Sequence, residues 1–131
     1  MKLSTKGRYG LTIMLDIAEG YKEDKFVSLN EISERENISL KYLEKIKTSL
    51  KKCDFFITSR GSSGGYKLKY DPSKYRIGDI IRASEEEVDI VSCVGSSDCP
   101  KKSMCRTYPL WKGLSDEIND YLNSKTLADY L

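Results

Sequence analysis

The sequence contains no histidine, so no imidazole is available for acid–base catalysis or for metal binding. It also lacks a recognisable nucleophile motif, and the glycine-rich run at 61–66 matches neither the G-x-G-x-x-G pattern nor the P-loop pattern. No apolar run approaches the length of a membrane span, and residues 1–8 lack the apolar stretch of a secretion signal. These absences predict a cytoplasmic protein that is not an enzyme and has no membrane partner.

Charge is distributed unevenly along the 131 residues. Residues 1–82 carry 17 Lys and Arg against 11 Asp and Glu, a net charge of +6, whereas residues 83–131 carry 5 against 9, a net charge of −4. The length suits one ordinary domain, or a small domain with an appended element. The basic part is therefore the one to test against nucleic acid.

Start signals and helical periodicity predict three helices in the basic part, over 4–19, 28–37 and 40–50. The second opens on Ser28 with a glutamate three residues later, which is a capping box that satisfies two free backbone donors. Ser39 is placed to cap the third helix. Two helices joined by so tight a turn indicate a helix-turn-helix, whose second helix enters the major groove of DNA.

A β-hairpin is expected directly after the third helix. Residues 55–59 and 66–70 are short β-prone segments, and the glycine-rich run 60–65 joins them. Three helices followed by such a ribbon make a winged helix, in which Arg60 would enter the minor groove or meet a phosphate. The alternative is an ordinary flexible turn with a solvated arginine.

Within the third helix, Leu43, Ile46 and Leu50 form a stripe for the core, and the charged residues near its start lie off that stripe. Lysine there can meet guanine acceptors or phosphates, and glutamate can accept from a cytosine amino group. A merely solvated helix face is the alternative. The residues predicted to contact DNA are Ser39, Lys41, Tyr42, Glu44, Lys45, Arg60, Gly61, Ser63 and Gly64.

Cys93, Cys99 and Cys105 lie at an even spacing in a polar stretch with little apolar surface to bury. Three thiols cannot pair completely as disulfides, and they are soft ligands for iron or an iron–sulfur cluster. Zinc is a competitor, although its structural sites favour shorter spacings, and unligated or redox-sensing thiols are a third interpretation. The separate Cys53 is predicted to be a small buried hydrophobe.

The acidic part ends in a second feature, a helix of about four turns with a wide apolar face. That face comprises Leu110, Trp111, Leu114, Ile118, Tyr121 and Leu122. After a short helix at 77–83, the chain offers no further large element to cover it, which favours pairing with the same helix of a second subunit. Folding back onto the first domain is the alternative. We expect a DNA-binding domain at 1–84 and a cysteine loop with dimerisation helix at 85–131.

Several segments resemble the family of iron–sulfur cluster regulators of the IscR type, and the match covers nearly the whole chain. They are Leu3-Ser-Thr-Lys-Gly-Arg-Tyr-Gly10, Ile32-Ser-Glu-Arg35, Ile38-Ser-Leu-Lys-Tyr-Leu-Glu44, Arg60-Gly-Ser-Ser-Gly-Gly-Tyr66, Gly78-Asp-Ile-Ile81, Cys-x5-Cys-x5-Cys and Leu110-Trp-Lys-Gly-Leu-Ser-Asp116. The resemblance implies a mainly helical, homodimeric winged-helix transcription factor, a repressor type that binds palindromic promoter DNA. It also implies a 2Fe-2S cluster whose occupancy controls cluster-assembly genes. Tyr42, Glu44 and Lys45 would then read bases, and Arg60 would serve the wing.

The chain departs from that family at the fourth cluster ligand. The family places a histidine three residues after the last cysteine, where this chain has Tyr108. A related nitric-oxide-sensing group uses an aspartate near the N-terminus, where this chain has Arg8. Three thiolates suit a 4Fe-4S cluster with one open iron, whereas a 2Fe-2S cluster would need Tyr108, a carboxylate such as Asp98, or an external ligand.

Two other classes of function stand beside this one. A regulator of similar fold, like the cysteine-metabolism repressors, would sense through a partner protein and carry no cluster. An enzyme or electron carrier could use the same cluster, but it would leave the winged helix without a purpose.

Overall fold

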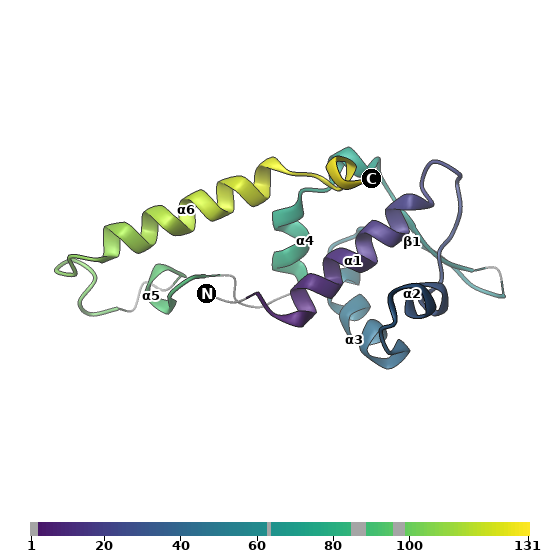
Figure 1. Cartoon of the computed structure of the whole chain (residues 1–131), viewed down its shortest axis with the longest axis horizontal. Helices are drawn as coiled ribbons and strands as arrows, with labels where there is room; N and C mark the ends of the chain where they lie inside the picture. The colour runs from purple at the N-terminus through teal and green to yellow at the C-terminus, as the bar shows by residue number, and fades with distance from the viewer. Residues whose placement is uncertain (1–2, 63, 85–88, 96–98) are drawn as a thin grey trace.

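The computed structural model describes residues 3–62, 64–84, 89–95 and 99–131. Its first helix, α1 (Thr5–Glu19), begins where predicted, with the Ser4 hydroxyl accepting from the backbone N–H of Gly7 at 3.2 Å. Ile13, Met14 and Ile17 are fully buried on one face of α1. Figure 1 shows this helix running through the middle of a helical body, where it is the element around which the core forms.

The predicted helix-turn-helix is formed by α2 (Leu29–Glu36) and α3 (Leu40–Lys51). The capping box at the start of α2 is present in both directions. Asn37 ends α2 in the left-handed conformation with a φ of 54°, and the Ser39 hydroxyl then caps α3 by accepting from the N–H of Tyr42. Asparagine tolerates this conformation better than most residues, so the chain turns between the helices at low cost.

The hairpin pairs β1 (Phe56–Ser59) with β2 (Gly65–Leu68) as a two-stranded antiparallel sheet. Its register sets Phe56 opposite Leu68 and Ser59 opposite Gly65. Val27, just before α2, exchanges two backbone hydrogen bonds with Tyr66, of 2.8 and 2.7 Å. The wing is therefore attached to the helix-turn-helix by its second strand.

A short η1 turn (Pro72–Lys74) leads into α4 (Ile77–Ser84), close to the predicted 77–83. The buried face of α4 contacts both α1 and α3. At one crossing a Cβ on Gly10 of α1 would collide with the Ser84 side chain, so the two helices approach as closely as only glycine permits. α4 thus packs on α1 and α3 and completes the winged-helix body.

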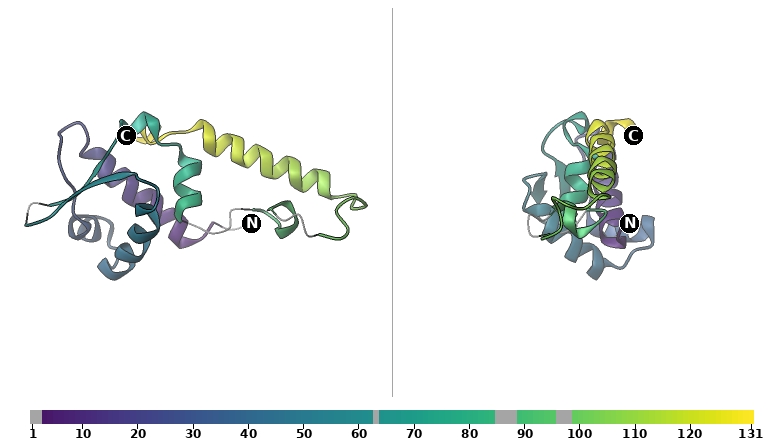
Figure 2. Two further views of the ribbon diagram at one scale, coloured as in Figure 1. Left: turned by 180° about the vertical axis from the view of Figure 1, so that it is seen from behind. Right: turned by 90° about the vertical axis from the view of Figure 1, so that its left-hand side faces the viewer.

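Two further helices form an arm that leaves this body (Figures 1 and 2). It comprises the one-turn α5 (Ser92–Gly95) and the long α6 (Tyr108–Ser124), which runs back towards the body. The final η2 turn (Leu127–Tyr130) buries Leu127 completely in the core. Within the described residues, no helix is long and apolar enough to span a membrane.

The prediction for Cys53 was wrong, because this thiol is exposed. A continued α3 would have placed position 53 on the buried stripe, three residues after Leu50. The helix instead ends at Lys51, and Asp54 adopts a positive φ of 56° that redirects the chain towards β1. The helix therefore stops two residues before Cys53, too early to place it on the buried stripe.

Candidate functional site

The N-terminal half of α3 presents the side chains that were predicted to meet base edges. Lys41, Glu44 and Lys45 are exposed, while Leu43 and Ile46 between them are fully buried. Tyr42 is half-buried because its ring packs edge-on against Tyr9 of α1, with centroids 5.8 Å apart. One face of α3 is therefore charged and exposed to solvent, while the buried stripe faces the core, as a helix inserted into a DNA groove requires.

Two other predicted contacts have clear local geometry. The Ser39 hydroxyl already caps α3, so its acceptor is used within the fold. In the wing loop Gly61 has a φ of 104°, and its carbonyl accepts from the N–H of Gly64 at 3.1 Å. Arg60 beside this turn is exposed and makes no ion pair with any described residue. The predicted contact Ser63 lies outside the described residues.

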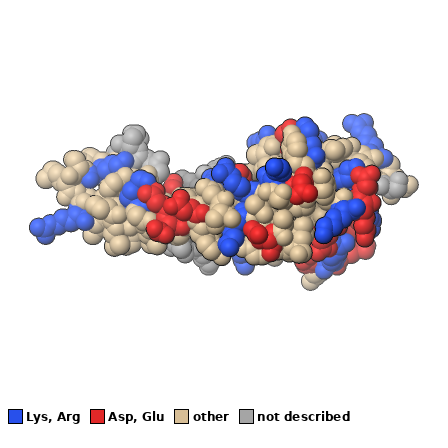
Figure 3. All heavy atoms as spheres, turned by 90° about the horizontal axis from the view of Figure 1, so that it is seen from above, with Lys and Arg blue, Asp and Glu red and all other residues tan. Residues whose placement is uncertain are grey.

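Overall charge does not mark out this interface by itself. Seen from above in the orientation of Figure 1, Lys and Arg side chains lie among Asp and Glu side chains over the body (Figure 3). The exposed start of α3 and the wing loop are therefore better guides to a nucleic-acid surface than the net charge of the chain.

The three loop cysteines are half-buried free thiols. Cys93 lies in α5, and Cys105 lies three residues before the first residue of α6. The hydroxyl of Thr107, 3.3 Å from Cys105 Sγ, and the backbone N–H groups of Thr107 and Tyr108 lower the pKa of the Cys105 thiol. The start of α6 thus favours the thiolate, which is the form that binds metals.

These thiols suit an iron–sulfur cluster by their chemistry, since such clusters are held by cysteine thiolates. The described residues nevertheless contain no group of three Cys, Asp or Glu side chains close enough to hold one metal ion. The three predicted ligands are therefore near one another in sequence, but their thiols are not close enough in this structure to share one metal ion. Tyr108 begins α6 and holds the Lys102 ammonium 5.0 Å from its ring centroid, while Asp98 lies outside the described residues.

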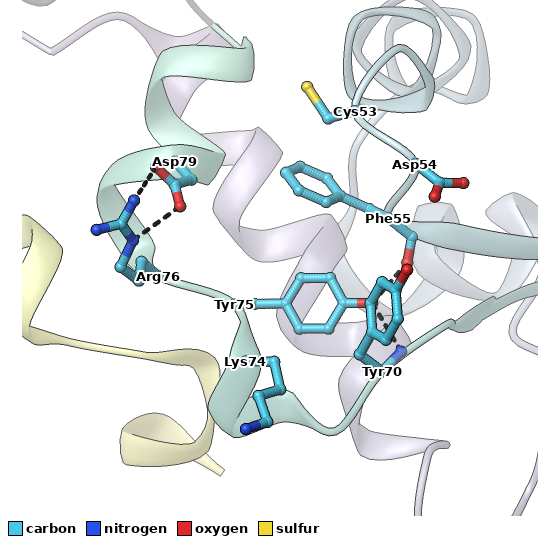
Figure 4. Close-up of a pocket in the computed structure, with 8 residues that line it drawn as sticks. All are labelled: Cys53, Asp54, Phe55, Tyr70, Lys74, Tyr75, Arg76 and Asp79. Carbon is cyan, nitrogen blue, oxygen red and sulfur yellow. Dashed lines mark hydrogen bonds and ion pairs between the residues drawn. The ribbon is translucent and has the colours of Figure 1, made fainter.

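A pocket of about 220 Å³ lies beside the exposed Cys53, between the end of α3 and the start of α4 (Figure 4). Its charged residues include Arg76 and Asp79, which pair with each other at 2.9 Å. Tyr75 donates its hydroxyl hydrogen to the carbonyl of Phe55 at 2.7 Å, and so serves the fold. These polar groups of the pocket wall thus already bond to one another or to the backbone, and so serve the fold.

Sequence reasoning missed a contact between α4 and α6. Arg82 of α4 hydrogen bonds to the side chains of Asn119 and Asn123 of α6. These partners are separated by 37 and 41 residues, so no local pattern could have indicated them. Only the packing of the arm on the body brings them together.

Comparison with known proteins matches residues 3–131 to the Rrf2 family model, described as an iron-dependent transcriptional regulator. The HTH-type transcriptional regulator IscR of Vibrio campbellii is 43% identical over 131 residues, covering all of this chain and 77% of that protein. Among solved structures, the global cysteine regulator CymR of B. subtilis has a TM-score of 0.82 and 35% identity, covering 99% of this chain and 95% of that one. T. potens IscR has a TM-score of 0.80 and 35% identity, covering 99% and 85%.

These likenesses confirm the winged-helix fold and the resemblance to IscR-type regulators. They also confirm that the chain is a DNA-binding regulator and not an enzyme, since the relatives are transcriptional regulators. The chain belongs to the Rrf2 family of transcriptional regulators.

Proposed function

We propose that this regulator binds palindromic promoter DNA as a homodimer and adjusts that binding to the state of an iron–sulfur cluster held by Cys93, Cys99 and Cys105. The genes it controls would be those of cluster assembly. The observation that carries the sensing part is the start of α6, where hydrogen bonds favour the Cys105 thiolate. The IscR-named relatives support the same assignment.

DNA reading is assigned to the open face of α3 and to the wing. Glu44 can accept from a cytosine amino group, whereas Lys41 and Lys45 can meet phosphates or guanine acceptors. Arg60 is suited to a narrow A·T-rich minor groove, whose negative potential attracts arginine. The exposure of all four side chains supports this division of roles.

The dimer is assigned to the apolar face of α6. Leu110, Leu114 and Tyr121 are 61%, 41% and 60% exposed in the single chain. Trp111 and Ile118 beside them are half-buried, and Leu122 packs against the body core. A two-fold pair of α6 helices would remove these side chains from water and place two α3 helices on one palindrome.

The cluster would be bound by three thiolates and a fourth ligand. Tyr108 is the candidate within the chain, because it adjoins the Cys105 site at the start of α6. An external ligand is the alternative, and a 4Fe-4S cluster with one open iron would need no fourth side chain. When bound, the cluster would supply a group at the end of the arm that can be oxidised, reduced or lost from the protein.

The decisive experiment is the visible spectrum of anaerobically isolated protein, with iron and acid-labile sulfide measured. Thiolate ligation to iron predicts brown protein containing both, and Cys93→Ala, Cys99→Ala or Cys105→Ala should each bleach it. Cys53→Ala is the matched control, since it removes an exposed thiol on the body and should keep the colour. Full colour in all three loop variants would overturn the ligand assignment.

The same spectra identify the fourth ligand. If Tyr108 completes the site, Tyr108→Phe should lose or destabilise the cluster, and Tyr108→His should make it more stable in air, because imidazole is a good iron ligand. An unchanged spectrum for Tyr108→Phe would place the fourth ligand outside this side chain.

A second candidate function is regulation through a partner protein without a cluster. The likeness to CymR favours it, as does the lack of a three-ligand metal group among the described residues. A colourless anaerobic preparation without iron or sulfide would support this candidate over the first.

A further inference from the structure

Arg82 of α4 contacts α6 through a planar guanidinium that makes three hydrogen bonds. Its Nη1 donates to Oδ1 of Asn119 at 3.0 Å, and its Nη2 donates to Oδ1 of Asn123 and, at 3.3 Å, to Oδ1 of Asp79. The Arg82 side chain is 35% exposed, so water only partly competes for these bonds. We call Arg82, Asn119 and Asn123 the α4–α6 clamp.

The α6 side of the clamp is held in place by its own helix. The Asn119 amide nitrogen donates to the Ser115 carbonyl at 3.0 Å, and Ser115 is only 3% exposed. That bond fixes which end of the amide is the oxygen, and it turns the oxygen towards Arg82. At 3.6 residues per turn, Asn119 and Asn123 lie on the side of α6 opposite Leu114, so the clamp and the proposed dimer face do not compete.

The α4 side of the clamp is equally constrained. Ile77, Ile80 and Ile81 bury α4 in the body, where it contacts α1 and α3. Gly78 also lies under the clamp, since a Cβ there would come within 2.7 Å of Nη2 of Arg82 and closer still to the Asn123 amide oxygen. The direction of α6 is therefore tied to α4, and through α4 to α3.

We infer that Arg82 is a specificity-determining positioning residue: by setting the angle between α6 and α4, the clamp sets the spacing of the two DNA half-sites. In a two-fold dimer built on α6, that angle decides how far each α3 lies from the symmetry axis. Half-sites must be about one helical turn apart, or a multiple of it, to meet both recognition helices. The inference rests on the proposed α6 dimer, and Arg82 itself touches no DNA in it.

The experiment measures binding of the apoprotein to duplexes that carry the same two half-sites with spacers of graded length. Wild-type protein should prefer one spacer sharply. Arg82→Ala loses several hydrogen bonds to a charged group, so its preference over spacers one or two base pairs longer or shorter should fall by about tenfold. Affinity for a duplex with a single half-site should stay unchanged, which shows that the α3 face is still folded.

Two further variants distinguish positioning from general stabilisation. Arg76→Ala removes a neighbouring arginine whose side chain pairs with Asp79, and it should keep the wild-type spacer preference. Gly78→Ala retains every clamp residue but puts a methyl group where Arg82 and Asn123 meet, so it should broaden the preference as Arg82→Ala does.

The results separate the inference from the proposed function. An unchanged spacer preference in Arg82→Ala and Gly78→Ala, or an equal loss on all duplexes including the single half-site, would overturn the clamp. A wild-type protein that is monomeric, or that shows no spacer preference, would instead contradict the proposed dimer.

Discussion

Asp16 is a buried carboxylate at the packing of α1 against the end of α2. It is 6% exposed, its Oδ2 accepts no hydrogen bond from any described residue, and that oxygen lies 3.6 Å from Nη1 of Arg35. Burial, and after it the neighbouring Glu36, raises the pKa of Asp16 from 3.8 to about 7 against a smaller lowering by Arg35. The folded protein therefore holds a proton on Asp16 that the unfolded chain has already lost.

We predict that this proton makes stability fall as pH rises. Between pH 3.8 and about 7 the folded state binds the proton and the unfolded state does not, so the unfolding free energy decreases with pH and levels off above 7. Asp16→Asn should remove the decrease and stabilise the protein at pH 8 by about 4 kcal/mol, since the pKa shift spans about three units and each corresponds to about 1.4 kcal/mol. Urea unfolding at pH 5 and pH 8 measures it.

Glu19→Gln is the control for Asp16→Asn, because it neutralises an exposed carboxylate that also faces Arg35. It should leave the pH dependence close to that of the wild type. Equal slopes for wild type and Asp16→Asn would mean that Asp16 is ionised in the folded protein across this range.

At the recognition surface, we predict that Glu44 and Lys41 act differently. Losing a good base contact costs roughly 1–3 kcal/mol of discrimination, so Glu44→Ala should broaden the selected DNA motif. Lys41→Ala, the matched control on the same face, should keep the motif. It should reduce the slope of log binding constant against log salt concentration by about one, the loss of one phosphate contact. Selection from random duplexes at fixed salt compares them, and an unaltered motif from Glu44→Ala would refute its assignment to a base.

At the scale of elements, helices that carry their own start and stop signals were predictable from sequence. The caps at Ser4, Ser28 and Ser39 each place a helix to within one or two residues of its observed bounds. By contrast α5 and η2 have four residues each, which is too short for any apolar periodicity to repeat. In the fold α5 packs against α6, and η2 packs against η1 and α1.

The candidate site shows the same limit. Exposure of Lys41 and Glu44 followed from the buried stripe of α3, because one helix determines both faces. The exposure of Cys53 did not follow, since it depends on a positive φ at Asp54 that ends the stripe. The α4–α6 clamp was also beyond sequence reasoning, because asparagine and arginine are ordinary residues on a solvated helix.

The exposed face of α6 yields a prediction about assembly. Leu114→Asp should weaken dimerisation and DNA binding together, because truncating or charging a large interface residue often costs about 2 kcal/mol or more. Gly113→Asp adds the same side chain off the apolar face, where nothing lies within 4 Å, and should change neither. Sedimentation and palindrome binding at matched concentrations measure both, and a wild-type monomer that binds a palindrome tightly would contradict the prediction.

For the molecule as a whole, backbone hydrogen bonds join the segment after α6 to the segment just before α4. The N–H of Ile77 donates to the Lys125 carbonyl at 2.8 Å, and the N–H of Leu127 donates to the Tyr75 carbonyl at 3.0 Å. Together with the burial of Leu127, they attach the C-terminal end of α6 to the winged-helix body. The other end of α6 lies away from that body (Figure 2), and Cys105 comes three residues before its first residue.

Because α6 is attached to the body at its C-terminal end, a small rotation there moves its other end a long way. The 17 residues of α6 make a helix roughly 25 Å long, so a tilt of about 10° at its base displaces its tip by roughly 4 Å. The relation also works in reverse. A displacement of a few ångströms at the far tip of α6 would reach the body as a rotation of several degrees about its base.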